Sequence, residues 1–491
     1  MKRSYFFTTI LLSALVTCGC SKQVGHAPEI NSVSDISGHR VAVVTGTCYE
    51  LQMSKRDDIK LTRFNSESDQ AQALVLGQAD VAVNDEVTFN AKMMKDLGFK
   101  MAFKGDESYP AAFGFRKSET ELLGSFNQFL AEVKANGTLD SLEGVWLKGD
   151  GKYPDPLRIY PNKGTGKPIR IGTAGATAPI SFRIQEDWFG IESELMYLFG
   201  EWLGRPVKLM SYAPTSVMMS LQTGDIDIMM GCVFVTEERK EVFNFSDVYH
   251  YYHPAYFVKD MDANAGGGLW EGIKRGVRRN LIEEGRWRFI TDGLWETVKI
   301  TLLSILFGSL LGMGLCAMAR SRRRALRKTA SLYNDFMQGI PMLVLLLIMF
   351  YVVFAGTSLS SSFVAIVAFA LNFAAGAGGV FRNALDSVPR GQTEAGLALG
   401  FTRLQTFFGI VLPQAVKLGL PMYKGQCVSL LKGTSIVGYI AVHDLTRASD
   451  LIRSRTFDAF LPLLVVTVIY FLLAALIGLI LNLIFNKSRA I

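Results

Sequence analysis

The sequence predicts two fold classes in one chain: an α/β region in the N-terminal half and an all-α region that crosses a membrane in the C-terminal half. The mean hydropathy of the 491 residues is +0.24, which is higher than expected for a disordered chain or an ordinary cytosolic enzyme. Residues 293–491 hold 18 Lys/Arg and 7 Asp/Glu, a net charge of +11, so the total of +7 leaves −4 for residues 1–292. The basic residues therefore indicate membrane topology rather than binding to nucleic acid.

Residues 1–20 have the pattern of an export signal. Lys2 and Arg3 precede an apolar run from Tyr5 to Val16 that is too short to span a bilayer comfortably. Cys18 and Cys20 leave three outcomes open: lipidation of either thiol, plain cleavage, or retention as an anchor. The α/β region is expected on the periplasmic or extracellular side of the cytoplasmic (inner) membrane.

Five membrane crossings are expected in residues 293–491. Four uncharged stretches are long enough to cross the bilayer, at 300–319, 336–355, 362–381 and 459–486, and a weaker fifth at about 422–442 contains Lys424 and Lys432. Five crossings put the basic cluster 320–328 and the loop 382–413 in the cytoplasm, as the positive-inside rule requires. The basic segment 261–292 is either an amphipathic helix on the membrane surface or a solvated linker.

The loop 382–413 predicts a cytoplasmic helix ended by Gly400, followed by a second apolar helix stopped by Pro413. It resembles the permease subunits of bacterial ABC importers for polar amino acids, whose motif is Glu-Ala-Ala, three residues, Gly, nine residues, Ile-x-Leu-Pro. Gly396 replaces the second Ala. The matching residues, which the resemblance implies couple transport to a separate ATPase, are Glu394, Ala395, Gly400, Ile410, Leu412 and Pro413.

Residues 30–260 alternate short apolar strands with helical patterns, which predicts sheets covered by helices. The expected strands are 41–44, 79–83, 169–171 and 226–230. Two passages resemble type II periplasmic amino-acid-binding proteins, in exchanged order: residues 30–148 are similar to lobe II with its returning C-terminal helices, and residues 168–260 to lobe I. The linker 149–167 joins them. Either the domain is circularly permuted and forms one cleft, or two truncated remnants stand side by side.

A permuted order predicts one remaining covalent crossing between the lobes, near residues 112–117. The strand 255–258 is then expected to lead toward the membrane instead of returning to the other lobe.

The resemblance also implies a ligand site for an α-amino acid. Arg239 stands at the position that binds the carboxylate, because Arg offers bidentate geometry, and Asp85 at the position that binds the amine. The simpler alternatives are a surface Arg and a helix-capping Asp. The loop that donates to the carboxylate is Gly46, Thr47 and Cys48, and the side-chain pocket is Thr177, Cys232 and Phe234. A disulfide between Cys48 and Cys232 is disfavoured, because a locked cleft could not cycle.

The sequence thus predicts a binding domain fused to an importer permease, a homodimer that works with a separate ATPase and moves an amino acid. It carries no phosphate-binding loop, no metal-type clustering of His and Cys and no nucleophile elbow, so neither a cofactor nor enzymatic activity is expected. A ligand-gated channel or sensor, and an exported enzyme built on the same lobes, remain alternatives.

Overall fold

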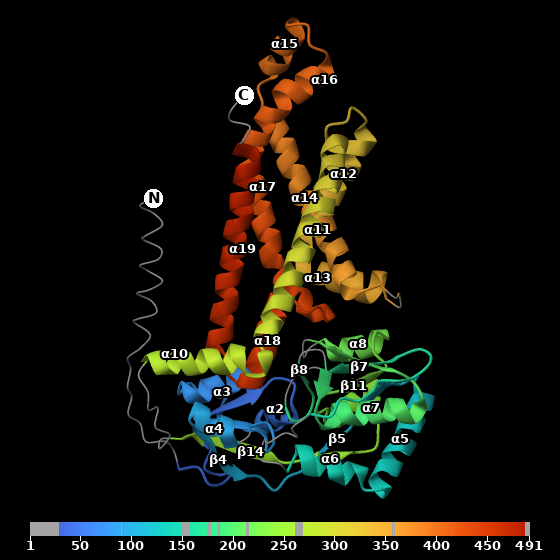
Figure 1. The fold of residues 1–491 in the computed structure, drawn as a ribbon, viewed down its shortest axis with the longest axis vertical. Helices are drawn as coiled ribbons and strands as arrows, with labels where there is room; N and C mark the ends of the chain where they lie inside the picture. Colours follow the sequence, from blue (N-terminus) through green and yellow to red (C-terminus); the bar gives the residue numbers. More distant parts are fainter. Residues whose placement is uncertain are drawn as a thin grey trace.

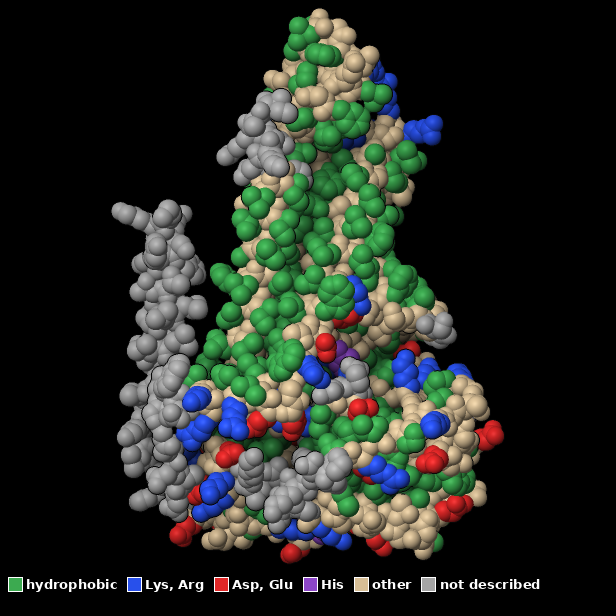
Figure 2. All heavy atoms as spheres, viewed as in Figure 1, with side chains coloured by type: hydrophobic (Ala, Val, Ile, Leu, Met, Phe, Trp, Pro, Cys, Tyr) green, Lys and Arg blue, Asp and Glu red, His purple; other side chains and the backbone are tan. Residues whose placement is uncertain are grey.

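The computed structural model describes residues 29–89, 91–148, 157–173, 178–184, 187–212, 216–260, 269–355, 357 and 359–486. A bilobed α/β part lies at one end of the molecule, and a stalk of long helices rises from it (Figure 1). Charged side chains crowd the surface of the α/β part, while the stalk is mostly apolar (Figure 2). The expected export signal and the C-terminal Lys487 and Arg489 lie outside the described residues.

The first lobe is built on a five-stranded sheet with the order β2-β1-β3-β14-β4. Strands β1 and β3 are buried along almost their whole length, as expected of central strands covered on both faces. Its strands are β1 (Arg40–Val44), β2 (Lys60–Phe64), β3 (Val81–Asp85), β4 (Phe99–Lys104) and β14 (Pro254–Lys259). Its helices are α2 (Cys48–Met53), α3 (Glu67–Val75) and α4 (Ala91–Leu97).

The second lobe repeats this pattern with the order β10-β7-β11-β6-β12. Its strands are β6 (Gly114–Arg116), β7 (Ile169–Thr173), β10 (Val207–Ser211), β11 (Ile228–Met230) and β12 (Phe243–Phe245), with a small hairpin of β8 (Phe182–Ile184) and β9 (Asp187–Phe189). Its helices are α5 (Thr120–Ala135), α6 (Thr138–Trp146), α7 (Ile191–Leu203), α8 (Val217–Thr223) and α9 (Glu237–Val242). In each sheet one strand runs antiparallel to both of its neighbours: β14 lies between β3 and β4, and β6 lies between β11 and β12.

The chain crosses between the lobes twice, so the prediction of one crossing is wrong. The first crossing runs through β5 (Tyr109–Ala111) into β6, and the second through β13 (His250–Tyr252) into β14. β5 and β13 pair with each other in an antiparallel ribbon. β14 pairs with β3 and β4, so it completes the first lobe's sheet before the chain turns to the stalk. The expected strands at 41–44, 79–83, 169–171 and 226–230 correspond to β1, β3, β7 and β11.

Three helices of the stalk are long and apolar enough to cross a membrane: α11 (Trp287–Ala319), α14 (Ser361–Asp386) and α19 (Phe460–Asn486). A bent pair adds a fourth if it counts as one span, namely α12 (Arg324–Gly339) with α13 (Met342–Ile348) and the π-turn η3 (Met349–Val353). The two halves of this pair meet at 103°, so the stretch 336–355 is not one straight helix as expected. Pro341 explains the bend, because it forces Ile340 out of the helical region.

Helix α17 (Leu412–Gly433) runs beside α14 and α19 but does not meet the same criteria of length and apolar composition (Figure 1). Before it come α15 (Arg390–Ala398), α16 (Arg403–Thr406) and the π-turn η4 (Phe407–Val411), which form a hairpin at the end of the stalk farthest from the α/β part. Pro413 does not stop a helix, contrary to expectation. It is the second residue of α17, and the π-turn η4 leads directly into this helix, so the helical backbone continues through Pro413.

Two helices lie between the stalk and the α/β part. α10 (Leu269–Val277) lies across the lower end of the spans (Figure 1), which matches the surface helix considered for this basic segment. The segment is not simply solvated, because Arg279 pairs with Asp458 at 2.9 Å and Arg286 with Glu284 at 3.0 Å. After α17 and η5 (Thr434–Ile440), helix α18 (Leu445–Thr456) contacts both lobes.

Candidate functional site

Arg239 joins the two lobes. It lies on α9 of the second lobe, after the N-cap Thr236. One guanidinium nitrogen, Nη1, donates to the carbonyl of Phe234 at 2.9 Å, and the other, Nη2, reaches the carbonyl of Gly46 in the first lobe at 2.7 Å. No carboxylate of the described residues pairs with it, and burial lowers its pKa. A half-buried guanidinium that bonds only carbonyls is free to take a carboxylate in their place.

Asp85 ends β3 in the first lobe with only 7% of its surface exposed. Its Oδ1 accepts hydrogen bonds from the Thr88 hydroxyl at 2.7 Å and from the Val87 N–H at 3.3 Å. Both bonds lie within the turn 85–88 and cap no helix, while Oδ2 has no hydrogen bond within the described part of the chain. Burial raises the pKa of Asp85 to about 6, with smaller increases from the charges of Glu86 and Glu67.

The loop 46–48 is shaped for close approach of its backbone. Gly46 has φ +81° and donates its N–H to Glu50 at 2.7 Å. Thr47 caps α2 and donates its hydroxyl to the Val44 carbonyl at 2.7 Å, so that hydroxyl is engaged within the loop. Cys48 is buried, and the charges of Asp85 and Arg239 both act on the pKa of its thiol, which burial raises strongly. The loop thus lies within the influence of both predicted ligand-binding charges.

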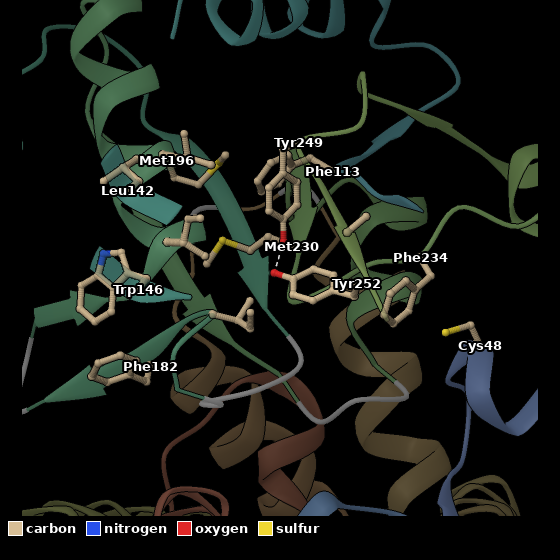
Figure 3. Close-up of a cluster of buried hydrophobic side chains, with 14 of the residues drawn as sticks. Cys48, Phe113, Leu142, Trp146, Phe182, Met196, Met230, Phe234, Tyr249 and Tyr252 are labelled. Atoms are coloured by element: carbon tan, nitrogen blue, oxygen red, sulfur yellow. Dashed lines mark hydrogen bonds between the residues drawn. The ribbon is translucent and has the colours of Figure 1, made fainter. Parts of the chain in front are cut away.

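Phe234 forms an aromatic wall at this junction. It meets Tyr49 edge-on at 5.7 Å between ring centres, and Tyr252 at 6.1 Å. Figure 3 shows Phe234 between Tyr252 and Cys48, with these residues coming from different segments of the chain. Cys48 and Cys232 are both free thiols. Thr177, predicted for the same pocket, lies outside the described residues.

Glu192 was not predicted as a site residue, yet it holds the pocket wall. It is fully buried at the start of α7 and accepts hydrogen bonds from the N–H groups of Gly231 at 2.6 Å and Cys232 at 2.9 Å. It also accepts from the Tyr249 hydroxyl at 2.7 Å, which in turn lies beside Tyr252 (Figure 3). Cys232 has φ +54°, a left-handed conformation that these bonds help to hold. The sequence offered one signal for Glu192, an acidic residue in the first turn of an otherwise apolar helix.

Helix α18 of the stalk contacts both lobes at once. Toward the second lobe, Arg447 donates to the Ser211 hydroxyl at 2.5 Å and to the Tyr212 carbonyl at 2.6 Å. Toward the first lobe, Arg453 pairs with Asp69, and Phe457 beyond the helix end packs on Phe89 at 4.9 Å. The lobes are therefore held against the same helix rather than linked to the stalk by chain alone.

The hairpin at the other end of the stalk exposes Glu394, which has no ion pair within the described residues. Gly400 has φ +84°, and the N–H of Phe401 bonds the carbonyl of Gly396 at 3.1 Å, which closes α15 as predicted. A Cβ on Gly396 would lie 2.6 Å from the Cγ2 of Thr406, so glycine lets α15 approach α16 closely. Large apolar side chains are exposed around this tip: Leu397, Leu399, Phe401, Leu404 and Phe408.

Ala395 is exposed on α15, and Ile410 lies in η4 with its side chain 3.0 Å from the position of a Cβ on Gly396. Leu412 begins α17. The predicted motif residues thus lie on one hairpin. Among the described residues, no group of three His, Cys, Asp or Glu side chains is arranged to hold a metal ion.

Comparison with known proteins identifies the helical part. A model of the family described as binding-protein-dependent transport system inner membrane component matches residues 304–490. The L-cystine transport system permease protein TcyB of Bacillus subtilis is 35% identical over 204 residues, which cover 41% of this chain and 87% of the relative. A putative glutamine transport system permease protein GlnP of Rickettsia conorii is 31% identical over 201 residues, 40% of this chain and 92% of the relative.

Among solved structures, the crystal structure of an amino acid ABC transporter with histidines is similar at 27% identity, with a TM-score of 0.38 over 45% of this chain and 99% of that one. The helical part is a membrane-embedded transport component. The chain belongs to the family of binding-protein-dependent transport system inner membrane components, and the relatives described here are ABC permeases rather than enzymes.

Proposed function

We propose that the chain is a fused receptor and permease of an ABC importer for polar amino acids. The α/β part captures the substrate outside the cytoplasmic membrane, the stalk carries it across, and a separate ATPase docks on the hairpin α15–α16. The observation that carries this proposal is Arg239, a guanidinium at the junction of the lobes whose partners within the described residues are carbonyls. Its charge and that of the buried Asp85 both act on Cys48. Together they match the carboxylate and ammonium of an α-amino acid.

The strand order supports one circularly permuted domain rather than two remnants. The first lobe's sheet contains β14, which follows the crossing strand β13, and the second lobe's sheet contains β6, which follows the crossing strand β5. The two lobes are therefore built from one continuous chain that passes between them twice. A ligand that bridged Arg239 and Asp85 would contact both lobes and favour their closure. Gly46 and Phe234 would shape the site through backbone approach and an aromatic wall, with Cys48, Cys232 and Thr47 at its margin.

The hairpin supports coupling to an ATPase. It lies at the end of the stalk opposite the α/β part (Figure 1), and it exposes large apolar side chains as well as Glu394, which has no ion pair within the described residues. Such a patch is typical of a surface that a protein partner covers. Alternation of α11, the bent pair, α14, α17 and α19 between the two ends would give five crossings and a cytoplasmic hairpin. In this proposal two copies form the transporter, each with its own α/β part.

The test uses the full chain in lipid nanodiscs, titrated calorimetrically with each of the twenty amino acids. We expect one group of polar amino acids to bind, Arg239→Gln to abolish binding, and the matched control Lys240→Gln, an exposed neighbour on α9, to leave it unchanged. No binding of any amino acid would remove the substrate claim.

Coupling is tested separately in proteoliposomes that contain the ATPase. Glu394→Lys should leave the protein folded and inserted but abolish ATP-driven uptake. Unchanged uptake would contradict the hairpin's role, and ATP-independent conductance would instead favour a ligand-gated channel.

A further inference from the structure

A positively charged segment leads into the first span. Residues 273–288 hold six Lys/Arg and two Asp/Glu, a net charge of +4. Helix α10 belongs to this segment and lies across the foot of the stalk, at the side where α19 begins (Figure 1). Figure 2 shows Lys and Arg side chains on the same side of the molecule, where the apolar stalk meets the charged α/β part. The positive-inside rule leaves this charge unexplained, because the segment lies at the end of the stalk opposite the hairpin α15–α16.

The segment 273–288 is pinned to the start of α19. Asp458 caps this span, because its Oδ1 accepts a hydrogen bond from the N–H of Leu461 at 3.2 Å. The other oxygen, Oδ2, accepts from Arg279 at 2.9 Å and from the buried Asn280 at 2.7 Å. A Cβ on Gly276 would lie 3.8 Å from the Cδ1 of Leu461, which is ordinary van der Waals contact. The end of α10 is therefore held at the level where α19 begins.

α19 presents an apolar surface from its first turn onward. Residues 460–486 include no charged side chain, and Phe460 and Leu463 are exposed. Ile273 on α10 and Trp287 at the start of α11 are exposed at the same end of the stalk. Tryptophan and long basic side chains favour the zone where hydrocarbon meets water. The segment 273–288 therefore lies at the depth of the lipid headgroups.

Three exposed cations of this segment form what we call the basic surface: Lys274, Arg278 and Arg288. Lys274 and Arg288 have no ion pair within the described part of the chain, and the Arg288 guanidinium lies 5.7 Å from the ring centre of Trp287. Arg278 approaches Glu283 only at 4.0 Å, and both side chains are exposed, so this pair contributes little. All three side chains are therefore available to an anionic partner.

Charge and position together define that partner. Guanidinium and ammonium groups bind phosphate oxygens through charge-assisted hydrogen bonds. Beside exposed apolar side chains, a basic surface attracts an anionic lipid by both charge and apolar contact, whereas a soluble anion would use the charge alone. Because the basic surface adjoins the apolar start of α19, an anionic phospholipid matches both of its properties.

We infer that the basic surface binds anionic phospholipid at the membrane face nearest the α/β part. Lys274, Arg278 and Arg288 contact the headgroup phosphates, and Ile273 lies against the adjoining acyl chains. The inference requires that the stalk spans a membrane, and it holds whichever ligand the lobes bind. It gives a role to cations that the proposed transport cycle does not use.

The test puts the photoreactive residue p-benzoylphenylalanine in place of the exposed Ile273 in the full chain. The protein is reconstituted in nanodiscs of phosphatidylcholine with a minor share of phosphatidylglycerol and illuminated, and the attached lipid is identified by mass spectrometry. The same residue in place of Phe471, exposed in the middle of α19, should report the bulk lipid ratio. At position 273 we expect phosphatidylglycerol to be enriched about threefold or more over that ratio, because each Lys or Arg near the headgroups strengthens binding of anionic lipid.

Neutralising the basic surface with Lys274→Gln, Arg278→Gln and Arg288→Gln together should return the lipid ratio at position 273 to the bulk value. The charge-conserving exchange Lys274→Arg, Arg278→Lys and Arg288→Lys should keep the enrichment. A matched control removes the same charge from three exposed lysines of the α/β part and should also keep it: Lys60→Gln, Lys163→Gln and Lys208→Gln.

A bulk lipid ratio at position 273 of the otherwise unmodified chain, or enrichment that persists without the three cations, would overturn the inference. Crosslinks to a second copy of the chain would overturn it as well, since the basic surface would then be an interface between proteins. If excess glycerol phosphate abolishes the enrichment where sodium chloride of equal ionic strength does not, the surface binds a soluble anion and the inference is wrong.

Circular dichroism and elution volume of each variant give the folding control. Failure of the proposed function has a separate signature, because it would appear as no amino-acid binding in the calorimetry of the unmodified chain and would leave the lipid ratio unchanged.

Discussion

Ligand affinity should fall as the pH is lowered, because Asp85 must be ionised to bind an ammonium group. Burial raises the pKa of this carboxyl from its ordinary 3.8 to about 6. Its folded pKa is raised, so its relative contribution to folding stability is present below about pH 4 and is lost as the pH rises through about 6. Ionising Asp85 in the empty protein above about pH 6 costs about 3 kcal/mol, because the pKa is raised by about 2.2 and each pKa unit corresponds to about 1.36 kcal/mol.

A bound ammonium removes much of that cost, so binding pulls the pKa of Asp85 back toward its ordinary value and releases a proton at intermediate pH. At about pH 7.5 nearly every Asp85 is ionised before binding, whereas at about pH 5 only about one in eleven is, so the dissociation constant should rise about tenfold. That factor corresponds to about 1.4 kcal/mol of binding free energy.

The assay is calorimetry of the full chain at both pH values, repeated in two buffers of different ionisation enthalpy to count the released protons. Asp85→Asn should bind weakly with no pH dependence, and the exposed control Asp96→Asn, in the same lobe, should retain the full tenfold change. The reasoning is refuted if the two dissociation constants agree within about a factor of two, or if Asp85→Asn keeps the wild-type pH dependence.

Three further substitutions test other contacts. Gly396→Ala puts a methyl group against Thr406 and should cost about 1–3 kcal/mol of stability, with ATP-driven uptake reduced; Thr406→Ala in the same chain should restore most of both, and additive effects would contradict the close packing. Tyr351→Phe removes the bond to the Ser220 hydroxyl at 2.9 Å and should cost about 1 kcal/mol, seen as faster hydrogen exchange in α8; unchanged exchange would count against that contact. Arg447→Met leaves the Tyr212 carbonyl without its donor and should weaken docking of the second lobe by about 3 kcal/mol, measured as a broader distance distribution between spin labels on α8 and α14; an unchanged distribution would show that α18 does not hold this lobe.

Local patterns predicted much of this chain. The α15 helix and its end at Gly400 follow from residues within a dozen positions, because a glycine with positive φ closes a helix by local geometry. The strands β1, β3, β7 and β11 follow from short apolar runs, and α11, α14 and α19 from long uncharged stretches. In each case the deciding contacts are neighbours in sequence or simple burial.

Predictions failed where a local signal has two meanings. Pro413 and Pro341 both indicate a break in a helix, but the helical backbone continues through Pro413 into α17, whereas Pro341 bends α12 against α13. Proline removes one N–H in either position, and only the packing of the flanking turns determines whether a helix starts, ends or turns there.

The sequence by itself determined that an α/β region precedes an apolar, basic helical region, and that Glu394 and Arg239 are candidate functional residues. Only the tertiary structure decided which sheet β14 joins, which groups Arg239 bonds, that Glu192 holds the pocket wall, and that α18 contacts both lobes. Composition and spacing report the burial and local geometry of a segment, whereas strand pairing and a cavity between distant segments depend on contacts across hundreds of residues, which no local pattern encodes.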